Sequence, residues 1–545
     1  MPSASFHNLQ RNRLEFFSSS LPSRPRTGGK IRPHTLFLAK LPLAKLPFIL
    51  WCALWYTSQQ YNIWGVPRVN GLKRRVHFVG VGGIGMSGLA EILLNLGYDV
   101  SGSDLKATEI TDRLAAYGLR FYEGHAASNI GDAGIVVVSA AVKPDNAEVV
   151  AARARGTLVI HRSDMLADLM RLKPNAVAVG GTHGKTTTTS MISAFLDRAN
   201  IGATSIVGGI LHRSGTNARW GTGDYLVAEA DEHDGSFLRL HPTISVVTSI
   251  DAEHLEYYGT LDGIQRAFVD FCNRIPFYGY SVVCWDDPNI RAVIPKIESV
   301  CIPYGIEEGA AVRGSNIRLA VPDPSRSKAV QLSDLRTRFD VEAHDARLPA
   351  AGRLGTLEVN AIGMHNVRNA LGACTVGLCL GMRFGMIADG LKLFDGVQRR
   401  LQVRGEARGV LVVEDYAHHP TEIASTLEAV RWTEPKRIVV VFQPHLYSRT
   451  KFFRDDFARV LASVDRAIVT DIYPSREEPM PGVDSSIVVE AAREQGAAHV
   501  SLIRDMYAVP AQIAPDLEPG DVVLVLGAGN INRIAEPLLW ELART

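Results

Sequence analysis

The sequence predicts an α/β protein in which parallel sheets are covered by helices. From residue 75 onward, short apolar and β-branched runs alternate with amphipathic stretches of helix length. This alternation is typical of parallel sheets, because consecutive parallel strands need a crossover connection that is usually a helix. The chain has 545 residues, which is enough for about three or four domains that each bury their own core.

The composition is that of a folded protein without a strong charge bias. Hydrophobic residues make up 46% of the chain and charged residues 21%, and 58 Lys and Arg against 57 Asp and Glu leave a net charge of +1. This balance argues against a general nucleic-acid binder or a polybasic membrane-binding protein. The six cysteines include no Cys-x-x-Cys pair and are too few for a disulfide scaffold, so we expect a reducing, cytoplasmic location.

Residues 1–73 differ from the rest of the chain. Residues 1–35 are rich in Arg, Ser, Pro and His, and the apolar stretch at 36–56 is interrupted by two lysines and two prolines. A membrane helix needs about 20 predominantly apolar residues, and a signal peptide carries its charges near the start. We therefore expect residues 1–73 to be a disordered extension or the product of a misassigned translation start, with a membrane anchor or signal peptide as the alternative.

The expected elements begin with a buried strand at 75–81 (RVHFVGV), a glycine-rich turn and a helix over 89–96. Residues 305–358 are irregular and polar, and we interpret them as β-rich loops inserted in the middle domain. Ligands of parallel α/β sheets bind at the carboxyl ends of the strands, so functional residues are expected there. The further strands are expected at 135–140, 177–181, 225–229, 244–250, 281–285, 437–443, 467–472 and 522–527.

The first glycine loop spans 80–85 and has the pattern G-x-G-x-x-G between a strand and a helix. Glycines there let backbone amides approach a diphosphate at a helix N-terminus. Asp104 ends the next strand and is placed to accept a hydrogen bond from a ribose hydroxyl. The motif suits NAD or a UDP-sugar equally, and a tight turn without a ligand stays open.

The second glycine loop, GGTHGKTT at 180–187, follows a strand and opens a helix. Val179 stands where a standard P-loop has its first glycine, so this loop is a variant shorter by one residue. Its small residues let backbone amides surround a phosphate, Lys185 neutralises phosphate oxygens, and Thr186 binds Mg²⁺. The loop therefore predicts nucleotide binding in the middle of the chain.

Acidic and histidine residues follow the neighbouring strands. Glu229 ends the strand at 225–229 and fits the acidic metal partner that a P-loop needs. His254 lies among carboxylates after the strand at 244–250. Its spacing alone leaves open whether it binds a second metal ion or only makes hydrogen bonds within its loop.

Taken in order, the motifs resemble those of the Mur ligases over about residues 74–540. One glycine loop would be weak evidence, whereas this many motifs in register are specific to the family. The motifs are GVGGIGMSGLAE (80–91), SGSD (101–104), HRSDMLADLM (161–170), GTHGKTTTT (181–189), VAEADEHDGSF (227–237), SIDAEHLEYYG (249–259), GMHNVRNALGA (363–373), FDGVQRRLQVRGE (394–406), EDYAHHPTEI (414–423), FQPHLYSRT (442–450) and GAGNI (527–531).

The resemblance implies three domains after the extension. Residues 74–173 would form a Rossmann-like domain that binds a UDP-sugar. Residues 174–396 would form a central P-loop ATPase domain with a mostly parallel sheet. Residues 397–545 would form a second Rossmann-like domain that closes on the nucleotide and the amino acid.

The family resemblance also implies an activity. It is the ATP- and Mg²⁺-dependent joining of L-alanine to the carboxylate of UDP-N-acetylmuramate, through an acyl phosphate, in peptidoglycan precursor synthesis. A murein tripeptide-recycling ligase is the alternative within the family. A nicotinamide-dependent oxidoreductase would have no use for the second glycine loop. A non-catalytic nucleotide-binding regulator would not need Lys185, Glu229 and His254 together. We expect small-molecule substrates, no nucleic acid or membrane partner, and a monomer or dimer.

Site residues follow from the resemblance, position by position. The implied catalytic residues are Lys185, His254 and Arg449. The implied metal ligands are Thr186, Glu229 and His254. The implied ATP-binding residues are Gly181, Thr182, His183, Gly184, Lys185, Thr186, Thr187, Asn366, Arg400 (with Arg399 beside it) and Asp415. The implied substrate-binding residues are Gly82, Gly83, Ile84, Gly85, Met86, Ser87, Asp104, His445, Tyr447 and Arg449.

Four positions depart from the residues common in the family. His233 replaces Ser, Ser249 replaces Asn, Glu253 replaces Asp and Leu446 replaces Arg. The last change removes one carboxylate contact, so the departures bear on amino-acid recognition rather than on the chemistry of ATP.

Arg449 lies four residues after His445, just beyond an expected strand, where the resemblance places amino-acid and carboxylate contacts. A structural alternative is that Arg449 pairs with Asp455 or Asp456.

Overall fold

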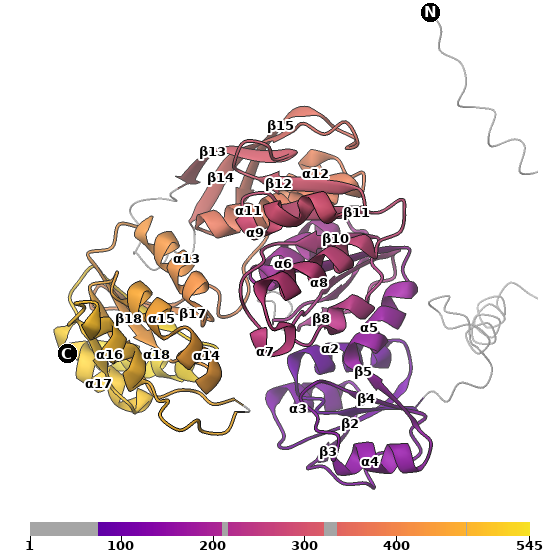
Figure 1. Ribbon diagram of the computed structural model, residues 1–545, viewed down its shortest axis with the longest axis horizontal. Coiled ribbons are helices and arrows are strands. Elements are labelled where there is room, and N and C mark those ends of the chain that lie inside the picture. The colour runs from indigo at the N-terminus through magenta and orange to yellow at the C-terminus, as the bar shows by residue number, and fades with distance from the viewer. Residues whose placement is uncertain (1–74, 210–215, 321–334, 476, 545) are drawn as a thin grey trace, which may run out of the picture. The chain divides into compact units, whose positions relative to one another are not determined.

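The computed structural model describes residues 75–209, 216–320, 335–475 and 477–544 (Figure 1). The extension expected at 1–73 lies outside these residues. The described part of the chain contains a five-stranded, a ten-stranded and a six-stranded sheet, in that order along the sequence. Helices pack on each sheet (Figure 1), which confirms the predicted α/β class.

The first sheet is wholly parallel and has the order β3-β2-β1-β4-β5. From the central strand β1, the sheet is built outward through β2 and β3 on one side and through β4 and β5 on the other. The loop that follows β1 therefore lies at a topological switch point, where such sheets bind ligands. The strands are β1 (Arg75–Val79), β2 (Asp99–Asp104), β3 (Arg120–Glu123), β4 (Ile135–Val138) and β5 (Leu158–His161). The helices are α2 (Ile84–Asn95), α3 (Glu109–Ala116), α4 (Ala147–Ala154) and α5 (Arg162–Arg171).

The second sheet has the order β15-β14-β13-β12-β11-β10-β6-β9-β7-β8. Its middle is parallel, whereas β8 at one edge and β14 and β15 at the other run antiparallel to their neighbours. The strands are β6 (Asn175–Gly180), β7 (Thr204–Ile206), β8 (Ala218–Arg219), β9 (Tyr225–Glu229), β10 (Ile244–Val247), β11 (Tyr280–Cys284), β12 (Cys301–Gly305), β13 (Val312–Ala320), β14 (Arg336–Ala343) and β15 (Gly352–Val359). The helices are α6 (Lys185–Arg198), α7 (Leu255–Tyr258), α8 (Leu261–Asn273), α9 (Pro288–Val293), α11 (Met364–Cys379) and α12 (Phe384–Lys392).

The interpretation of residues 305–358 as β-rich loops is correct in its β content for the described part of that stretch, but most of these residues lie in regular strands rather than in loops. Strands β13, β14 and β15 form an antiparallel extension of the main sheet. Helix α11 contacts β13 and helix α12 contacts β15, while charged side chains such as Arg338 remain about half exposed. A strand with one solvated face is rich in polar residues, and this composition was mistaken for that of loops.

The third sheet has the order β16-β17-β21-β18-β19-β20 and is parallel apart from the β16–β17 hairpin. Residues of β18 alternate between two apolar cores, with Val440 in one and Val439 in the other. The strands are β16 (Gln402–Ala407), β17 (Val410–Asp415), β18 (Arg437–Phe442), β19 (Arg466–Val469), β20 (Val500–Leu502) and β21 (Asp521–Leu526). The helices are α13 (Pro420–Arg431), α14 (Tyr447–Phe452), α15 (Arg454–Leu461), α16 (Ser486–Glu494), α17 (Val509–Ile513) and α18 (Ala535–Arg544).

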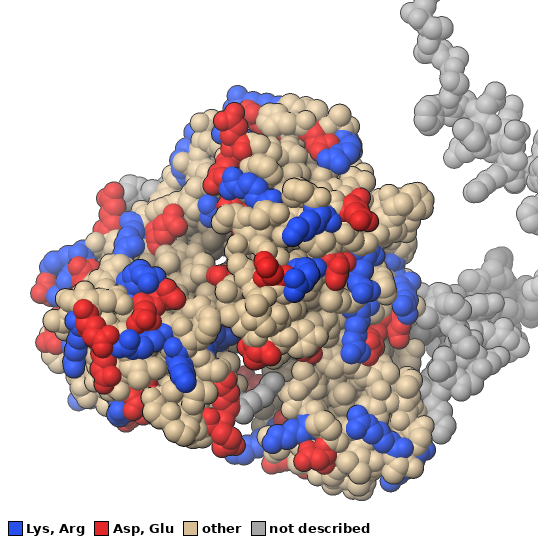
Figure 2. Space-filling view, viewed as in Figure 1, with Lys and Arg blue, Asp and Glu red and all other residues tan. Residues whose placement is uncertain are grey.

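All the strands expected from the sequence are present, and most end one to three residues earlier than expected. The difference falls at the carboxyl ends, where the chain turns into a functional loop. No helix among the described residues is long and apolar enough to cross a membrane. Figure 2 shows positive and negative side chains interspersed over the face in view.

Candidate active site

The second glycine loop connects β6 to α6, and its backbone requires glycine at two positions. Gly181 has φ of +125° and Gly184 has φ of +83°. A Cβ atom at Gly181 would overlap Thr248, and one at Gly184 would overlap the side-chain oxygen of Asn369. Helix α6 begins directly after Gly184, so its free N-terminal amides face the loop and favour an anion there.

Lys185 is held at the start of α6 by three acceptors. Its Nζ donates to the carbonyl oxygens of Gly181 at 2.6 Å and Thr182 at 3.0 Å, and to Glu232 Oε1 at 2.9 Å. Burial alone would lower the pKa of Lys185, but the nearby carboxylates of Glu232 and Asp231 outweigh it and raise the pKa. Lys185 is therefore a fixed cation whose charge partner in this structure is Glu232.

Glu232 is a buried carboxylate with a perturbed pKa. Burial raises the pKa of Glu232 to about 7, although the Lys185 cation beside it acts in the opposite direction. An anionic phosphate at Lys185 would compete with this carboxylate for the same cation. Sequence reasoning did not assign Glu232 a role, although it lies in the VAEADEHDGSF motif.

Thr186 and Glu229 lie together as the sequence predicts. Thr186 Oγ1 donates to Glu229 Oε2 at 2.8 Å, and the amide of Gly208 donates to the same oxygen at 2.8 Å. Two ligands at right angles on Mg²⁺, with bonds of about 2.1 Å, lie about 3.0 Å apart. The hydroxyl and carboxylate oxygens therefore fit the donor set and the spacing of a magnesium site.

His254 lies at the start of α7, with φ of +55°. Its Nδ1 is 3.0 Å from Nδ1 of His233, and its Nε2 is 4.0 Å from Glu232 Oε1. Burial lowers the pKa of His254, with Glu253 acting in the opposite direction, which favours the neutral imidazole that a metal ion binds. His233 entered the sequence argument only as a departure from the family pattern.

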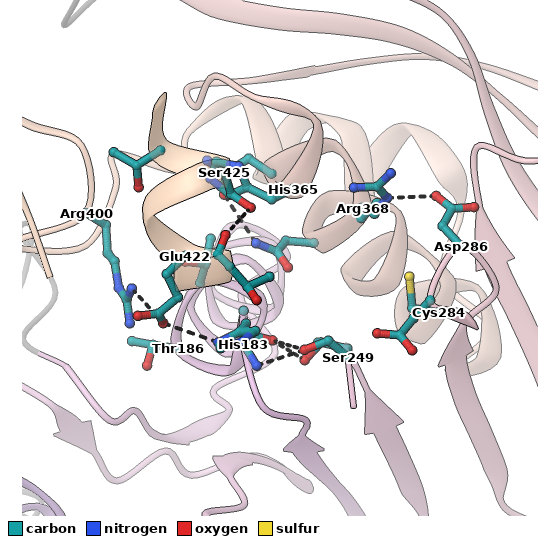
Figure 3. A pocket seen from close by; sticks show the side chains of 18 of the residues that line it. His183, Thr186, Ser249, Cys284, Asp286, His365, Arg368, Arg400, Glu422 and Ser425 are labelled. Atoms are coloured by element: carbon teal, nitrogen blue, oxygen red, sulfur yellow. Dashed lines mark hydrogen bonds and ion pairs between the residues drawn. The ribbon is translucent and has the colours of Figure 1, made fainter. Parts of the chain in front are cut away.

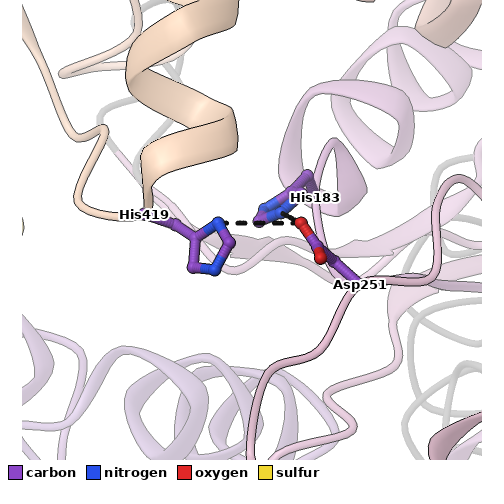
Figure 4. Close-up of side chains that lie close together, drawn as sticks. All are labelled: His183, Asp251 and His419. Atoms are coloured by element: carbon purple, nitrogen blue, oxygen red, sulfur yellow. Dashed lines mark hydrogen bonds and ion pairs between the residues drawn. The ribbon is translucent and has the colours of Figure 1, made fainter. Parts of the chain in front are cut away.

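His183 in the glycine loop joins two carboxylates from the loops of different sheets, Asp251 (Figure 4) and Glu422. Its Nε2 is 3.2 Å from Asp251 Oδ2, and its Nδ1 is 3.4 Å from Glu422 Oε1 at the start of α13. Burial alone would lower the pKa of His183, but hydrogen bonds to the two carboxylates raise it to about 10. Thr421 Oγ1 donates to Asp251 at 2.7 Å, and His419 Nδ1 lies 3.7 Å from Asp251. A charged imidazole thus links the phosphate loop to the third sheet.

A cavity of about 300 Å³ opens beside this loop (Figure 3). It brings together residues predicted from distant motifs and is wide enough for part of a nucleotide. Its lining includes seven predicted ATP-binding residues: His183, Gly184, Thr186, Thr187, Asn366, Arg400 and Asp415. It also includes Ser249, one of the four departures from the family pattern, and residues that the sequence analysis did not single out, among them Asp287, His365, Arg368, Asn369 and Glu422.

Two neighbouring arginines lie in the segment between α12 and β16, residues 393–401, which we call the hinge. They have different roles. Arg400 lines the cavity and lies 3.7 Å from Glu422, so it remains available to an anionic ligand. Arg399 instead donates to Glu414 at 2.7 Å and to the carbonyl of Gly527 at 2.6 Å, which fixes the hinge to the third sheet.

Asp415 also lines the cavity, but both of its carboxylate oxygens accept backbone amides. Leu401 and Ala417 each donate to it at 2.7 Å. Asp415 therefore shapes the hinge, and its contact with the nucleotide stays a prediction.

Arg449 pairs with Glu253 of the second sheet's loops, and both side chains are about nine-tenths buried. Its Nη1 also donates to Nδ1 of His445 at 3.2 Å. Burial would raise the pKa of Glu253, but the Arg449 guanidinium outweighs it and brings the pKa to about 2. The alternative pairing is wrong, because Asp455 pairs with Arg454 and Asp456 pairs with Arg459. Tyr447 begins α14 between His445 and Arg449.

The first glycine loop borders a second cavity, of about 420 Å³. Four predicted residues line it: Gly83, Ile84, Gly85 and Met86. Glu229 and His233 line the same cavity, so it reaches the residues around the phosphate loop. Arg162 also lines it, pairs with Asp231 at 2.6 Å, and was missed although it lies in the HRSDMLADLM motif.

Three predicted substrate residues in or beside this loop, Gly82, Ser87 and Asp104, make hydrogen bonds within the fold. Ser87 is fully buried and donates to the carbonyl oxygen of Ile84 at 2.9 Å. Asp104 accepts from the amides of Gly82 and Leu105, each at 2.8 Å. Asp104 therefore holds the loop in shape, and its predicted contact with a ribose hydroxyl remains untested.

Family models of the Mur ligases match three consecutive parts of the chain. The Mur ligase family catalytic domain matches residues 75–174, the Mur ligase middle domain matches 179–377, and the Mur ligase glutamate ligase domain matches 399–529.

Curated proteins and a solved structure resemble nearly the whole described chain. The UDP-N-acetylmuramate–L-alanine ligase of Desulfotalea psychrophila is 46% identical over 465 residues, which is 85% of this chain and 97% of that protein. The protein of the same name from Geobacter sp. strain M21 is 47% identical, over 86% of this chain and 97% of its own. The crystal structure of the UDP-N-acetylmuramate–alanine ligase of Thermotoga maritima has a TM-score of 0.69 and 27% identity, and covers 86% of this chain and 98% of its own. With its three domain models in order and relatives at this identity, the chain belongs to the Mur ligase family.

Proposed function

We propose that the protein is an ATP-dependent ligase that joins L-alanine to the carboxylate of UDP-N-acetylmuramate in peptidoglycan precursor synthesis. One observation carries most of the proposal. Among the described residues, the loops of the second sheet carry three features that the reaction needs. They are Lys185 in the phosphate loop, the Thr186–Glu229 oxygen pair, and Glu253, which pairs with the buried Arg449 of the third sheet. The names of the 46–47% identical relatives support the choice of substrates.

ATP would bind with its phosphates on the glycine loop and the N-terminus of α6. Lys185 would release Glu232 and offset the charge of the γ-phosphoryl group. Thr186 and Glu229 would hold Mg²⁺, which offsets the repulsion between ATP and the anionic carboxylate. Arg400 would contact the nucleotide from the hinge.

A carboxylate is a poor electrophile, so it must be activated first. The carboxylate oxygen of the sugar substrate would attack the γ-phosphorus, giving an acyl phosphate and ADP. The neutral amine of L-alanine would then attack the carbonyl carbon, and inorganic phosphate would leave as the amide forms and the amine nitrogen loses a proton. Arg449 and His445 would hold the carboxylate of the amino acid.

The same geometry suggests how the acyl phosphate is kept from water. The His183 cluster joins the phosphate loop to the start of α13 through Asp251 and Glu422. Such a link would complete the site from two domains and exclude water during transfer.

The cysteines fit the expected cytoplasmic location. All five cysteines in the described ranges are free thiols, and burial raises the pKa of each, for instance to about 11 at Cys272. Free thiols are usual in a reducing compartment, where ATP is also available.

The test is an acceptor panel with the purified protein, UDP-N-acetylmuramate and ATP-Mg²⁺, in which phosphate release is measured. We expect turnover with L-alanine, and a kcat/KM for glycine lower by about 10–200-fold, since one methyl group is worth that much in a small pocket. Faster turnover with the murein tripeptide than with L-alanine would establish the recycling ligase instead. No phosphate release with any acceptor would refute the proposal.

A further inference from the structure

We propose that His233 and His254 together hold a divalent cation through their Nδ1 atoms, and that this two-imidazole site prefers a first-row transition-metal ion to Mg²⁺. A metal ion at His254 is already implied by the resemblance to the Mur ligases, so this inference rests on the proposed function in that respect. The second imidazole, and the metal preference that follows from it, are features of this chain.

The separation of the two nitrogens is that of neighbouring ligands on one ion. His233 Nδ1 and His254 Nδ1 lie 3.0 Å apart, and the rings meet edge to face with their centroids 4.6 Å apart. Imidazole nitrogens bind metal ions at about 2.1 Å, and two such bonds at a right angle place the nitrogens about 3.0 Å apart. The two nitrogens, which lie at hydrogen-bond distance from each other in this structure, are thus already at the spacing of two ligands on one ion.

A carboxylate completes the cluster on one side. Glu256 Oε1 lies 3.5 Å from His254 Nδ1, and the ligand atoms of all three side chains lie within 4.8 Å of one another. The Glu256 side chain is 70% exposed, so it is free to approach the ion. The remaining coordination positions would be open to water or to a substrate oxygen.

The loops that carry the two histidines are fixed before any ion binds. The amide of His233 donates to Asp231 Oδ1 at 3.2 Å, and Tyr258 of α7 donates to the carbonyl of Glu232 at 2.6 Å. The second contact ties the helix that follows His254 to the loop that carries His233. This preorganisation reduces the cost of bringing the ligands together.

The donor atoms determine which ion is preferred. Mg²⁺ binds oxygen ligands and loses its water reluctantly, whereas imidazole nitrogens favour first-row transition metals. His233 also lines the cavity that contains the first glycine loop. The ion would therefore lie on the side of the sugar substrate, while the Thr186–Glu229 pair has the all-oxygen character of a magnesium site.

The experiment measures Mn²⁺ binding to the full protein without nucleotide, by the loss of the free Mn²⁺ signal in electron paramagnetic resonance. Glu229→Gln is the background for all samples, so that the oxygen site does not contribute. We expect His233→Ser to weaken Mn²⁺ binding by about 10-fold or more. Pulsed measurements should show coupling to two imidazole nitrogens before the substitution and to one after it.

The matched control is His344→Ser, which removes an exposed histidine 3.6 Å from a carboxylate elsewhere in the chain. It should leave Mn²⁺ binding unchanged, and thermal unfolding should show that both variants are folded. Equal Mn²⁺ affinity with and without His233, or displacement of Mn²⁺ by an equal concentration of Mg²⁺, would overturn the proposal. Because this readout needs no turnover, it can succeed while the ligase assay fails, or the reverse.

Discussion

At the scale of single residues, each of two cations in the site is paired with a buried carboxylate from the loops of the second sheet. Lys185 pairs with Glu232, and Arg449 pairs with Glu253. In both cases an anionic group of a substrate would take over the cation from the protein's own carboxylate. Because each cation is already desolvated and held in the site, this exchange of partners requires little further reorganisation.

Lys185→Ala should lower kcat by at least about 100-fold, the usual cost of removing a fixed donor from a developing charge. The other cation of the loop, His183, is already paired with Asp251 and Glu422 and is not expected to replace Lys185. Phosphate release with all three substrates measures the effect. Lys436→Ala, which removes an exposed lysine paired with Glu518, is the control and should keep normal turnover. A Lys185→Ala enzyme with more than about a tenth of the wild-type rate would show that the phosphate is stabilised elsewhere.

Arg449→Lys should lower kcat/KM for L-alanine by about 10-fold or more, which corresponds to about 1.4 kcal/mol. A lysine is a point charge and cannot reproduce the planar, two-pronged contact of a guanidinium with a carboxylate. Initial rates at varied L-alanine concentration measure this ratio. Arg459→Lys on the exposed face of α15 is the control. If Arg449→Lys behaves like that control, Arg449 serves only to pair with Glu253.

The free energy of unfolding of the wild-type protein should fall in mild acid because of the buried His365. Burial lowers the pKa of His365 to about 4, with the Arg400 and Arg368 charges adding to the effect, whereas a histidine in the unfolded chain has a pKa near 6.5. Between these values the unfolded state binds a proton that the folded state does not, so the stabilisation is complete above about pH 6.5 and is lost as the pH falls to about 4.

Urea unfolding at a series of pH values tests this assignment. The free energy of unfolding of His365→Gln should fall less steeply than that of the wild type between about pH 6.5 and 4. His344→Gln, at an exposed position, should follow the wild-type curve. Parallel curves for His365→Gln and the wild type would mean that His365 does not cause the acid sensitivity.

Residue types and their spacing predicted those site residues that lie in a short motif directly after a strand. The phosphate loop, Lys185 and the Thr186–Glu229 pair lie in short motifs next to their own strands. Asp251, Glu422 and Arg162 were missed because their partners lie far away in the sequence. Ser87 and Asp104 show the opposite error, since a motif position does not reveal that the side chain is used within the fold.

At the scale of the elements, the strand-loop-helix unit from β6 to α6 is fixed by backbone conformation as well as by composition. Gly184→Ala should abolish ATP binding, because the new methyl group would overlap Asn369 and the residue has φ of +83°. Gly496 has the same φ and nothing within 4 Å of its Cβ position. Gly496→Ala should therefore lower the free energy of unfolding by only about 1–2 kcal/mol, the cost of placing a Cβ atom in the left-handed backbone conformation. Calorimetric titration with ATP separates the two effects, and equal ATP affinity in both variants would contradict this account.

The elements also show where pattern reading works. Strands that are buried on both faces, such as β6 and β10, stand out as apolar runs and were predicted within a few residues. Strands β13 to β15 are more polar, and the sequence predicted β-rich loops there without the bounds of the strands.

At the scale of the whole molecule, the site depends on contacts that join different sheets. Thr421 reaches Asp251 across 170 positions of the sequence, and Arg449 reaches Glu253 across 196. The order of the domains could be predicted from the motifs, but the pairing of these side chains depends on tertiary packing. Catalysis therefore requires the second and third sheets to present their loops to the same substrates.

The central claim is that ATP activates the carboxylate of UDP-N-acetylmuramate before L-alanine attacks it, and isotope transfer tests this most directly. The substrate is labelled with ¹⁸O in that carboxylate and incubated with ATP-Mg²⁺ and L-alanine, and the phosphate released is analysed by mass spectrometry. Each phosphate formed together with an amide bond should carry one ¹⁸O atom, because the oxygen that attacks the γ-phosphorus leaves with it. Release of unlabelled phosphate, or of phosphate without an amide product, would contradict the proposed function.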